Sequence, residues 1–341
     1  MTFTVAIAGF GWWGKHIATR LSGNERIRVV SIVEPARQRH PEIQALGYQI
    51  DLDLAEALAR DDVQAVILTT PNPLHEEQVI ACAAARKHVF CEKPLGLTGE
   101  SARRSVAACK RAGVTLGIGH ERRFEPAMQA LMAMVAQGDF GTVMHAEAAF
   151  SHDKLIGVPP GDWRRSKAVS PAAGMTAMGI HLTDLYIAMF GRVSTVQAMT
   201  ADRILGWETG DVVTVQLGFE AGMTASLSAV LYTPHFMRMH VFGSAQWVEI
   251  RNDTHPDTPG GFAELVLART GEPHVTRRFG WTDSVVANLE AFAEAALGRA
   301  DYPNTHEEMI HNIEVLEAIA LSAAHRETVH LAAPAAARMV S

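Results

Sequence analysis

A glycine-rich loop near the N-terminus is the first segment whose residue spacing suggests chemistry. It reads Gly9-Phe10-Gly11-Trp12-Trp13-Gly14 and follows the apolar run Phe3 to Ala8. Glycines spaced in this way allow a tight turn, close approach of the backbone to a pyrophosphate, and close packing of a helix on a strand. The N-terminus of the following helix would favour an anion. The loop predicts a dinucleotide site. An ordinary tight turn is the simpler alternative, and the two tryptophans either wall the cofactor cleft or only pack.

An acidic residue follows the second β-rich run, where a dinucleotide-binding unit contacts its ribose. Glu34 lies 20 residues beyond Gly14, and a carboxylate at this spacing accepts hydrogen bonds from the adenosine ribose. It favours NAD over NADP, because a 2′-phosphate would meet like charge. Arg37, Arg39 and His40 follow closely and are able to receive that phosphate, so NADP is not excluded.

A lysine in the turn Cys91-Glu92-Lys93-Pro94 is the first candidate for acid–base chemistry. The turn follows the fifth β-rich run, and open α/β sheets bind ligands beyond the carboxyl ends of their strands. A lysine is normally a solvated surface cation. Beside a nicotinamide, however, Lys93 would be partly desolvated and able to act as a general acid or base.

A helical pattern in the second half of the chain carries a second candidate. One apolar stripe, with spacings of 4, 3 and 4, consists of Met178, Leu182, Leu185 and Met189. This stripe predicts a core-facing surface. The neighbouring row has the same spacing and places His181 and Asp184 on one side of the helix. The pair is either a structural histidine held by a carboxylate or part of an active site.

The elements that must position these residues alternate in type through the first third of the chain. The expected strands are Phe3 to Ala8, Arg28 to Val33, Ala65 to Thr69, His88 to Cys91 and Thr115 to Ile118. The expected helices between them are Lys15 to Leu21, Leu54 to Ala59, Leu74 to Ala85 and Glu100 to Ala112. This alternation predicts βαβ units and a doubly wound parallel sheet, the Rossmann architecture, over residues 1–121.

The remainder, residues 122–341, has a different pattern. A helix near 124–137, a strand near 143–150 and a Gly/Pro-rich loop from 157 to 171 lead into one long helix. Successive β-rich runs from Val193 to about Phe279 predict a large open, mostly antiparallel sheet. Two helical patterns near 283–297 and 307–323 follow, and we expect the Ala-rich tail after Leu331 to be loose. The second domain is therefore also α/β.

Composition limits the classes of partner. A chain of 341 residues with 48% apolar and 20% charged residues suits a two-domain globular protein. The net charge of −7 disfavours nucleic acid and anionic membranes. Three cysteines without a CxxC pair suggest neither a disulfide framework nor a zinc site. The N-terminus has no signal-peptide pattern, and His181, Thr183 and Asp184 would be costly in a bilayer. We expect a cytoplasmic protein and no metal, since His306 and His311 miss the HExxH spacing.

Six motifs in order along the chain resemble those of the Gfo/Idh/MocA family of NAD(P)-dependent oxidoreductases. They are Gly9-Phe-Gly-Trp-Trp-Gly14, Thr70-Pro-Asn-Pro-Leu-His75, Glu92-Lys-Pro94, Arg123-Phe-Glu-Pro126, Trp163-Arg164 and Gly179-Ile-His-Leu-Thr-Asp184. The resemblance covers nearly the whole chain. Glu-Lys-Pro and the Gly-Ile-His helix are its specific parts.

The resemblance implies a hydride transfer between nicotinamide and a hydroxyl or carbonyl carbon of a sugar, polyol or related cyclic substrate. It places Lys93 beside the nicotinamide and His181 at the reacting oxygen. The residues that it places along the cofactor are Thr70, Pro71, Asn72, His75 and Glu92. It also implies oligomerisation through the C-terminal sheet, as a dimer or tetramer. One departure is that Ala177 stands where many polyol dehydrogenases of the family have an aspartate.

Several alternatives stay open from the sequence. His120, Arg122 and Arg164 lie where they would contact substrate, but each is equally consistent with a structural or solvent-facing role. Some relatives use a transient oxidation to achieve elimination or hydrolysis with the cofactor recycled, and the missing aspartate favours a non-standard reaction slightly. A dinucleotide-sensing regulator without catalysis is a third reading. It is disfavoured because Lys93 and His181 are both present.

Overall fold

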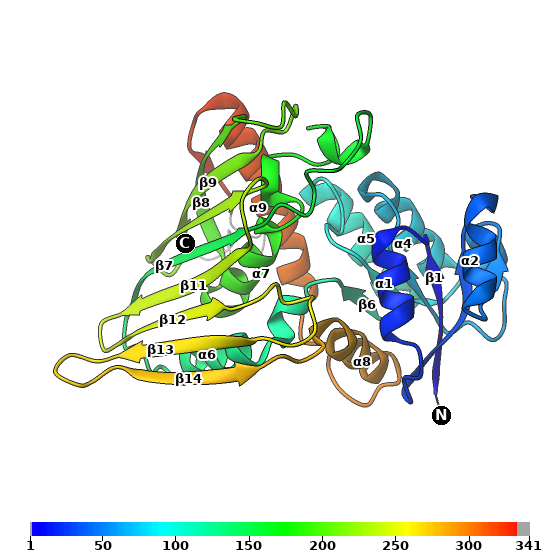
Figure 1. The fold of residues 1–341 in the computed structure, drawn as a ribbon, viewed down its shortest axis with the longest axis horizontal. Helices are drawn as coiled ribbons and strands as arrows, with labels where there is room; N and C mark the ends of the chain where they lie inside the picture. Colours follow the sequence, from blue (N-terminus) through cyan, green and yellow to red (C-terminus); the bar gives the residue numbers. More distant parts are fainter. Residues whose placement is uncertain (1, 333–341) are drawn as a thin grey trace. The chain divides into compact units, whose positions relative to one another are not determined.

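A computed structural model describes residues 2–332 of the chain, which form two compact units (Figure 1). The first comprises the chain up to Glu121 together with Val285–Ile310. The second comprises Arg122–Ser284 and the chain from His311 onward. Most of the Ala-rich tail lies outside the described residues. No helix within residues 2–332 is long and apolar enough to cross a membrane.

The first unit is built on a six-stranded parallel sheet with the strand order β3-β2-β1-β4-β5-β6. Its strands are β1 (Phe3–Ala8), β2 (Ile27–Val33), β3 (Gln49–Asp51), β4 (Ala65–Leu68), β5 (His88–Cys91) and β6 (Leu116–Ile118). Every residue of β4 is buried, as expected for a central strand with helices on both faces. The predicted doubly wound sheet is confirmed, and only the short edge strand β3 was not foreseen.

The helices of this unit are α1 (Trp12–Arg20), α2 (His40–Ala45), α3 (Leu54–Leu58), α4 (His75–Ala84), α5 (Gly99–Ala112) and α8 (Ser284–Ala296). Local sequence fixes the ends of α5 at both sides. Thr98 and Ser101 form a capping box at its N-terminus, and Gly113 ends it with φ +68°. The chain therefore turns sharply from α5 into β6.

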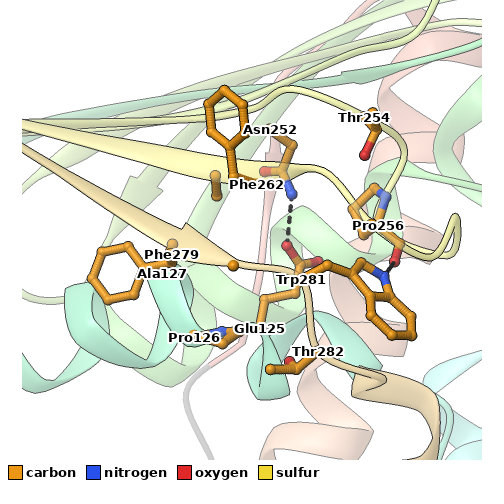
Figure 2. A pocket seen from close by; sticks show the side chains of 13 residues that line it. Glu125, Pro126, Ala127, Asn252, Thr254, Pro256, Phe262, Phe279, Trp281 and Thr282 are labelled. Carbon is orange, nitrogen blue, oxygen red and sulfur yellow. Dashed lines mark hydrogen bonds between the residues drawn. The ribbon is translucent and has the colours of Figure 1, made fainter.

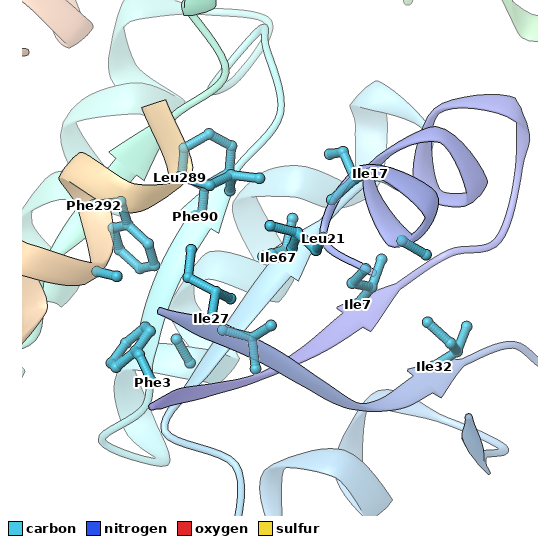
Figure 3. Packing of buried hydrophobic residues seen from close by; sticks show 14 of the residues in the cluster. Phe3, Ile7, Ile17, Leu21, Ile27, Ile32, Ile67, Phe90, Leu289 and Phe292 are labelled. Carbon is cyan, nitrogen blue, oxygen red and sulfur yellow. The ribbon is translucent and has the colours of Figure 1, made fainter. Parts of the chain in front are cut away.

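A segment far along the sequence completes the core of this unit (Figure 3). The buried Phe292 of α8 lies edge-on to Phe3 and to Phe90, with ring centroids 6.0 and 5.6 Å apart. Leu289, also on α8, joins the same cluster. Residues 285–310 thus pack with the Rossmann unit, so a single boundary after residue 121 does not describe the two units.

The second unit contains a nine-stranded sheet with the order β14-β13-β12-β11-β7-β10-β9-β8-β15. Its strands are β7 (Val143–Ser151), β8 (Val193–Ala201), β9 (Val212–Phe219), β10 (Thr224–Val230), β11 (Phe236–Gly243), β12 (Trp247–Asn252), β13 (Phe262–Ala268), β14 (Val275–Gly280) and β15 (Val329–His330). All neighbours are antiparallel except β7 and β10. The predicted mostly antiparallel sheet is confirmed.

The helices along this sheet are α6 (Pro126–Ala136), α7 (Gly179–Phe190) and the part of α9 (His306–His325) that follows Ile310 (Figure 1). Strand β9 shows the resulting polarity, since Val213, Val215 and Leu217 are buried whereas Thr214 and Gln216 are exposed. One face of the sheet is the core of the unit. The alternating pattern of this strand leaves its other face open in the single chain.

The predicted long helix is shorter than expected at its start. A separate turn, η5 (Ala173–Met175), precedes α7, and Ala172 and Ala173 have positive φ values of 57° and 50°. Gly174 in this turn packs closely on β10, because a Cβ at Gly174 would lie 2.9 Å from the Cβ of Ala229. Ala177 consequently precedes the helix and does not share a helical row with His181.

Candidate active site

The glycine-rich loop connects β1 to α1 with the geometry of a dinucleotide cradle. Gly9 has φ +94°, and a Cβ at Gly14 would lie 2.1 Å from the carbonyl oxygen of Gly9. These two positions need glycine for the fold itself. Gly11 does not: a Cβ there would meet nothing closer than the Arg39 guanidinium at 3.9 Å. The open space above Gly11 fits the close approach of a pyrophosphate.

Two tryptophans and a histidine stack at the start of α1. Trp12 and Trp13 have ring centroids 5.3 Å apart, and His16 lies 5.0 Å from Trp13. Trp13 lies close to the Glu92 carboxyl, whereas Trp12 is 66% exposed. Trp13 therefore packs at the turn that carries Lys93, and Trp12 presents its indole outward.

Glu34 follows β2 and is buried beside the glycine-rich loop. Its carboxylate accepts hydrogen bonds from the backbone N–H of Phe10 at 3.1 Å and of Ala36 at 2.9 Å. Arg39 lies 3.3 Å from the same carboxylate, and the backbone oxygen of Glu34 is 2.8 Å from His40 Nε2. Glu34 thus fixes the loop and also holds a cation close to Gly11. Arg37 belongs to a neighbouring turn, η1 (Arg37–Arg39).

The loop after β4 is attached to the lysine-bearing turn through a buried histidine. His75 Nδ1 lies 2.7 Å from the backbone oxygen of Pro94, and Nε2 lies 2.9 Å from that of Thr70. Burial lowers the pKa of His75. Thr70 also bonds to Gln78, Asn72 is buried and Pro71 is exposed. The imidazole therefore holds two loops together at the carboxyl edge of the sheet.

The turn after β5 places a buried carboxyl next to the candidate lysine. The Glu92 carboxyl packs so closely on Gly119 that a Cβ at that glycine would lie 2.5 Å from it. Burial, followed by the neighbouring Glu121, raises the pKa of Glu92 to about 8, although Lys93 opposes the shift. Glu92 is therefore largely protonated at neutral pH. Lys93 itself is half-buried.

His181 lies in the first turn of α7 in the second unit and is only 3% exposed. Gly179 allows the helix to begin there, because a Cβ at that position would lie 2.3 Å from the sulfur of Met175. Asn312 of α9 binds the same turn, accepting from the Thr183 hydroxyl at 2.6 Å and donating to the Ile180 oxygen at 3.2 Å. The start of the helix that carries His181 is therefore firmly positioned.

Asp184 lies one turn further along α7 in a bidentate ion pair with Arg123. Arg123 Nε donates to Oδ2 and Nη2 to Oδ1, both at 2.7 Å. Both partners are buried, and a paired, buried fork of this kind is rigid. Arg123 belongs to the turn η3 (Glu121–Phe124). The pair thus connects α7 to the segment that begins the second unit.

The three other substrate candidates are found in different surroundings. His120 is buried after β6. Arg122 is buried and pairs with Glu125 at 2.9 Å and with Asp257. Arg164 is half-exposed and lies 3.1 Å from Asp162 and 4.3 Å from the centre of the Trp163 ring. The charges of Arg122 and Arg164 are thus already engaged by carboxylates.

A small cavity with a volume of about 30 Å³ is lined in part by Glu125, the ion-pair partner of Arg122 (Figure 2). Glu125 accepts a hydrogen bond from Asn252 at 2.9 Å on one side, and Trp281 donates to the Pro256 oxygen at 2.7 Å on the other. His120, Arg122, Arg164 and His181 are not among the residues that line this cavity.

Sequence reasoning missed one group of residues in the second unit. His152, His235 and His255 gather with His181 around the buried ring of Phe150. They come from separate loops, so no local spacing in the sequence predicts that they lie together. His311, by contrast, is structural: its Nε2 accepts from the Val193 N–H at 2.9 Å. Within residues 2–332, no group of three or more histidine, cysteine, aspartate or glutamate side chains could hold a metal ion.

A parallel sheet with this glycine-rich loop and a carboxylate after β2 defines a Rossmann-type dinucleotide-binding protein. Two family models match the chain. One describes an oxidoreductase family with an NAD-binding Rossmann fold and matches residues 3–120, and the other describes the GFO/IDH/MocA C-terminal domain and matches residues 128–249. The chain belongs to the Gfo/Idh/MocA family of oxidoreductases, which confirms the resemblance. It is an NAD(P)-dependent oxidoreductase with an NAD-binding domain.

Individual relatives agree with this assignment. The chain is 31% identical over 231 residues to 4-carboxy-2-hydroxymuconate-6-semialdehyde dehydrogenase of a Sphingobium strain, covering 66% of this chain and 70% of that protein. It is 37% identical over 144 residues to an inositol 2-dehydrogenase of Mycolicibacterium smegmatis, covering 40% and 41%. The structure of GenD2 from gentamicin A biosynthesis, in complex with NAD, matches with a TM-score of 0.83 and 25% identity over 97% of both chains.

Proposed function

We propose that the protein is a dehydrogenase or reductase that transfers a hydride between NAD and a hydroxyl or carbonyl carbon of a sugar, polyol or related cyclic substrate. Lys93 and His181 act as its acid–base pair. The observation that carries the proposal is the place of Lys93. It is a half-buried lysine directly after a parallel strand of an NAD-binding sheet, where such sheets bind ligands.

In this proposal the protein's own side chains carry out proton transfer at the substrate oxygen. When bound, NAD supplies the hydride acceptor for alcohol oxidation. As the carbon loses hydride, its hydroxyl must lose a proton, and negative charge develops on oxygen. Lys93 stabilises that charge as an ammonium or accepts the proton as an amine. His181 offers the second donor or acceptor.

The surroundings of Lys93 suit this role. Burial and the neighbouring Glu121 raise the pKa of Glu92 to about 8, whereas Lys93 opposes the shift. The protonation of Glu92 and the charge of Lys93 are therefore electrostatically linked, as is common where side chains move protons.

Asp184 acts as a positioning residue in this scheme. Its two oxygens each accept a hydrogen bond from Arg123, so we propose that it holds the first turns of α7, and His181 with them, through that ion pair. This differs from a direct role in catalysis.

The names of the relatives support a hydroxyl or carbonyl compound as the substrate. The names of the matched proteins include a dehydrogenase of inositol, one of a carboxylated muconate semialdehyde and an aldose-aldose oxidoreductase. These compounds share a hydroxyl or carbonyl carbon open to hydride transfer and differ in charge. The class of reaction is therefore better supported than any one substrate.

Turnover of NAD with a panel of sugars, inositols and uronates tests the proposal. Lys93→Met should leave the NAD dissociation constant within several-fold but lower turnover by roughly 10²-fold or more, the usual scale for lost acid–base catalysis. His181→Ala should behave in the same way. Steady accumulation of NADH identifies net oxidation, whereas product formation without NADH would indicate recycled cofactor. Near wild-type turnover in both variants would refute the pair.

A further inference from the structure

Four histidines and one arginine surround a single buried phenyl ring in the second unit. The distances from the ring centroid of Phe150 are 5.5 Å to His255, 5.7 Å to His152, 6.4 Å to His181, 6.4 Å to His235 and 5.8 Å to the guanidinium carbon of Arg122. His255 is also 5.2 Å from His152 and 5.3 Å from His235. We call His152, His235 and His255 the histidine cluster.

Sheet register explains why these residues meet. Phe150 lies near the end of β7, and His152 follows that strand. Strand β11 pairs antiparallel with β7 so that Phe236 lies opposite Ser151, which puts His235 at the same end. His255 belongs to the loop between β12 and β13. Because His181 also contacts Phe150, the histidine cluster lies beside the residue proposed to meet the reacting oxygen.

The two cations near the histidine cluster differ in their ion-pair partners. Arg122 is held by two carboxylates, Glu125 and Asp257, and Asp257 also lies 3.6 Å from His255. Lys154 is the remaining cation. Within residues 2–332, no carboxylate lies within ion-pair distance of its ammonium group, although Asp257 and Arg122 both act on it electrostatically. Burial lowers the pKa of Lys154, although the residue is exposed overall in the single chain.

Burial disfavours the protonated form of two histidines in the cluster, His255 and His235. Burial lowers the pKa of His255 to about 3, and Lys154 and Arg122 lower it further against the opposing effect of Asp257. At His235, burial is again the main cause, and Lys154 and Arg122 outweigh Asp257. Lys154 and Arg122 are therefore near enough to His235 to disfavour its protonated form. Neutral imidazoles there still offer N–H donors.

We propose that the substrate carries a carboxylate, and that this group binds to Lys154 and the histidine cluster beside Phe150. The inference rests on the proposed function, since it takes His181 as the residue at the reacting oxygen. A neutral hydroxyl would leave Lys154 without a counter-charge. A phosphate dianion would require a second available cation, and Arg122 is already committed to two carboxylates. A single carboxylate matches one ammonium and several neutral donors.

Direct binding to matched sugars tests this inference without requiring turnover. Calorimetric titration of the full-length protein with saturating NADH would compare D-glucuronate with D-glucose and D-galacturonate with D-galactose. D-glucose 6-phosphate serves as the phosphate probe. We expect at least one uronate to bind roughly tenfold or more tightly than its neutral partner, with a preference that weakens as salt is added.

Two variants identify the residue responsible. Lys154→Gln removes the charge of an exposed-edge lysine without disturbing the core, and it should reduce the uronate-to-neutral ratio of affinities by roughly tenfold. Lys110→Gln, on the exposed side of α5 in the other unit, is the matched control and should keep the wild-type ratio. A His235→Ala variant should reduce the ratio as well, by less than Lys154→Gln.

The inference is overturned if neither uronate binds, if each neutral sugar binds as tightly as its uronate, or if Lys154→Gln keeps the preference. Tighter binding of D-glucose 6-phosphate than of D-glucuronate would also overturn it. These failures differ from a failure of the proposed function. If Lys93→Met and His181→Ala lose turnover while no uronate preference exists, only the carboxylate site is wrong. If both variants keep turnover, the acid–base pair is wrong whatever the uronates do.

Discussion

Replacing Glu92 by glutamine should stabilise the protein, and the gain should grow with pH. The folded protein raises the Glu92 pKa to about 8, above the ordinary value near 4.5. Between these values the folded state retains a proton that the unfolded chain releases, so wild-type stability falls as pH rises through this window. Each pH unit corresponds to about 1.4 kcal/mol. The cost of keeping Glu92 protonated is therefore about 1 kcal/mol at pH 5.5 and about 3 kcal/mol at pH 7.

Glutamine has the shape of the protonated acid and carries no charge at any pH, so Glu92→Gln should recover this free energy of unfolding. Urea unfolding followed by tryptophan fluorescence at pH 5.5, 7 and 8.5 measures the difference. Glu77→Gln, on the exposed face of α4, is the control and should change stability little at each pH. A Glu92→Gln effect that is constant across pH, or that destabilises, would show that Glu92 is ionised in the folded protein.

Four further outcomes are expected. Glu34 should make NADH bind more tightly than NADPH in fluorescence titrations; tighter NADPH binding would instead identify Arg39 as a phosphate partner. Arg123→Met should lower turnover and also shift the pH profile of turnover, because it frees the carboxylate of Asp184 near the turn that holds His181; an unchanged profile would contradict a positioning role. The free energy of unfolding of the wild type should fall by about 2 kcal/mol between pH 7 and pH 5, and His255→Asn should not show this fall. The reason is that the folded state keeps His255 neutral down to about pH 3, while the unfolded chain takes up a proton below about 6.5. Sedimentation should show a dimer or tetramer, because exposed Met144 and Met199 lie on strands of the open sheet; a single 37.0 kDa species would refute association.

Much of the first unit was predictable because its strands are continuous apolar runs. The expected strand Phe3 to Ala8 has the same limits as β1, and His88 to Cys91 the same limits as β5. Strands buried on both faces leave little ambiguity in such runs. The short strand β3 was not predicted because its three residues, which have partly polar side chains, carry no periodic signal. Its pairing with β2 depends on the neighbouring strand instead of its own sequence.

The start of α7 shows where local pattern fails. The apolar spacing before His181 continues through Ala177, and pattern alone extends the helix backward. In the structure, Gly174 packs against Ala229 of β10 and the chain takes positive φ values at Ala172 and Ala173. The turn therefore contacts a strand that lies more than fifty residues later in the sequence. The local sequence pattern therefore does not predict where this helix begins.

In the candidate site, too, some residues could be proposed from local motifs, whereas others come together only in the fold. Gly9, Gly11 and Lys93 could be proposed from the sequence because each belongs to a short motif whose chemistry depends on neighbours in the chain. Arg123 and Asp184 are 61 positions apart, and His152 is more than 80 positions from His235 and His255; strand register and helix packing bring these residues together. Short motifs carry the residues assigned to cofactor binding, whereas the proposed substrate contacts lie where the sheet brings separate loops together. That is why the reaction class could be proposed from motifs, while the charge of the substrate had to be inferred from the surroundings of Phe150.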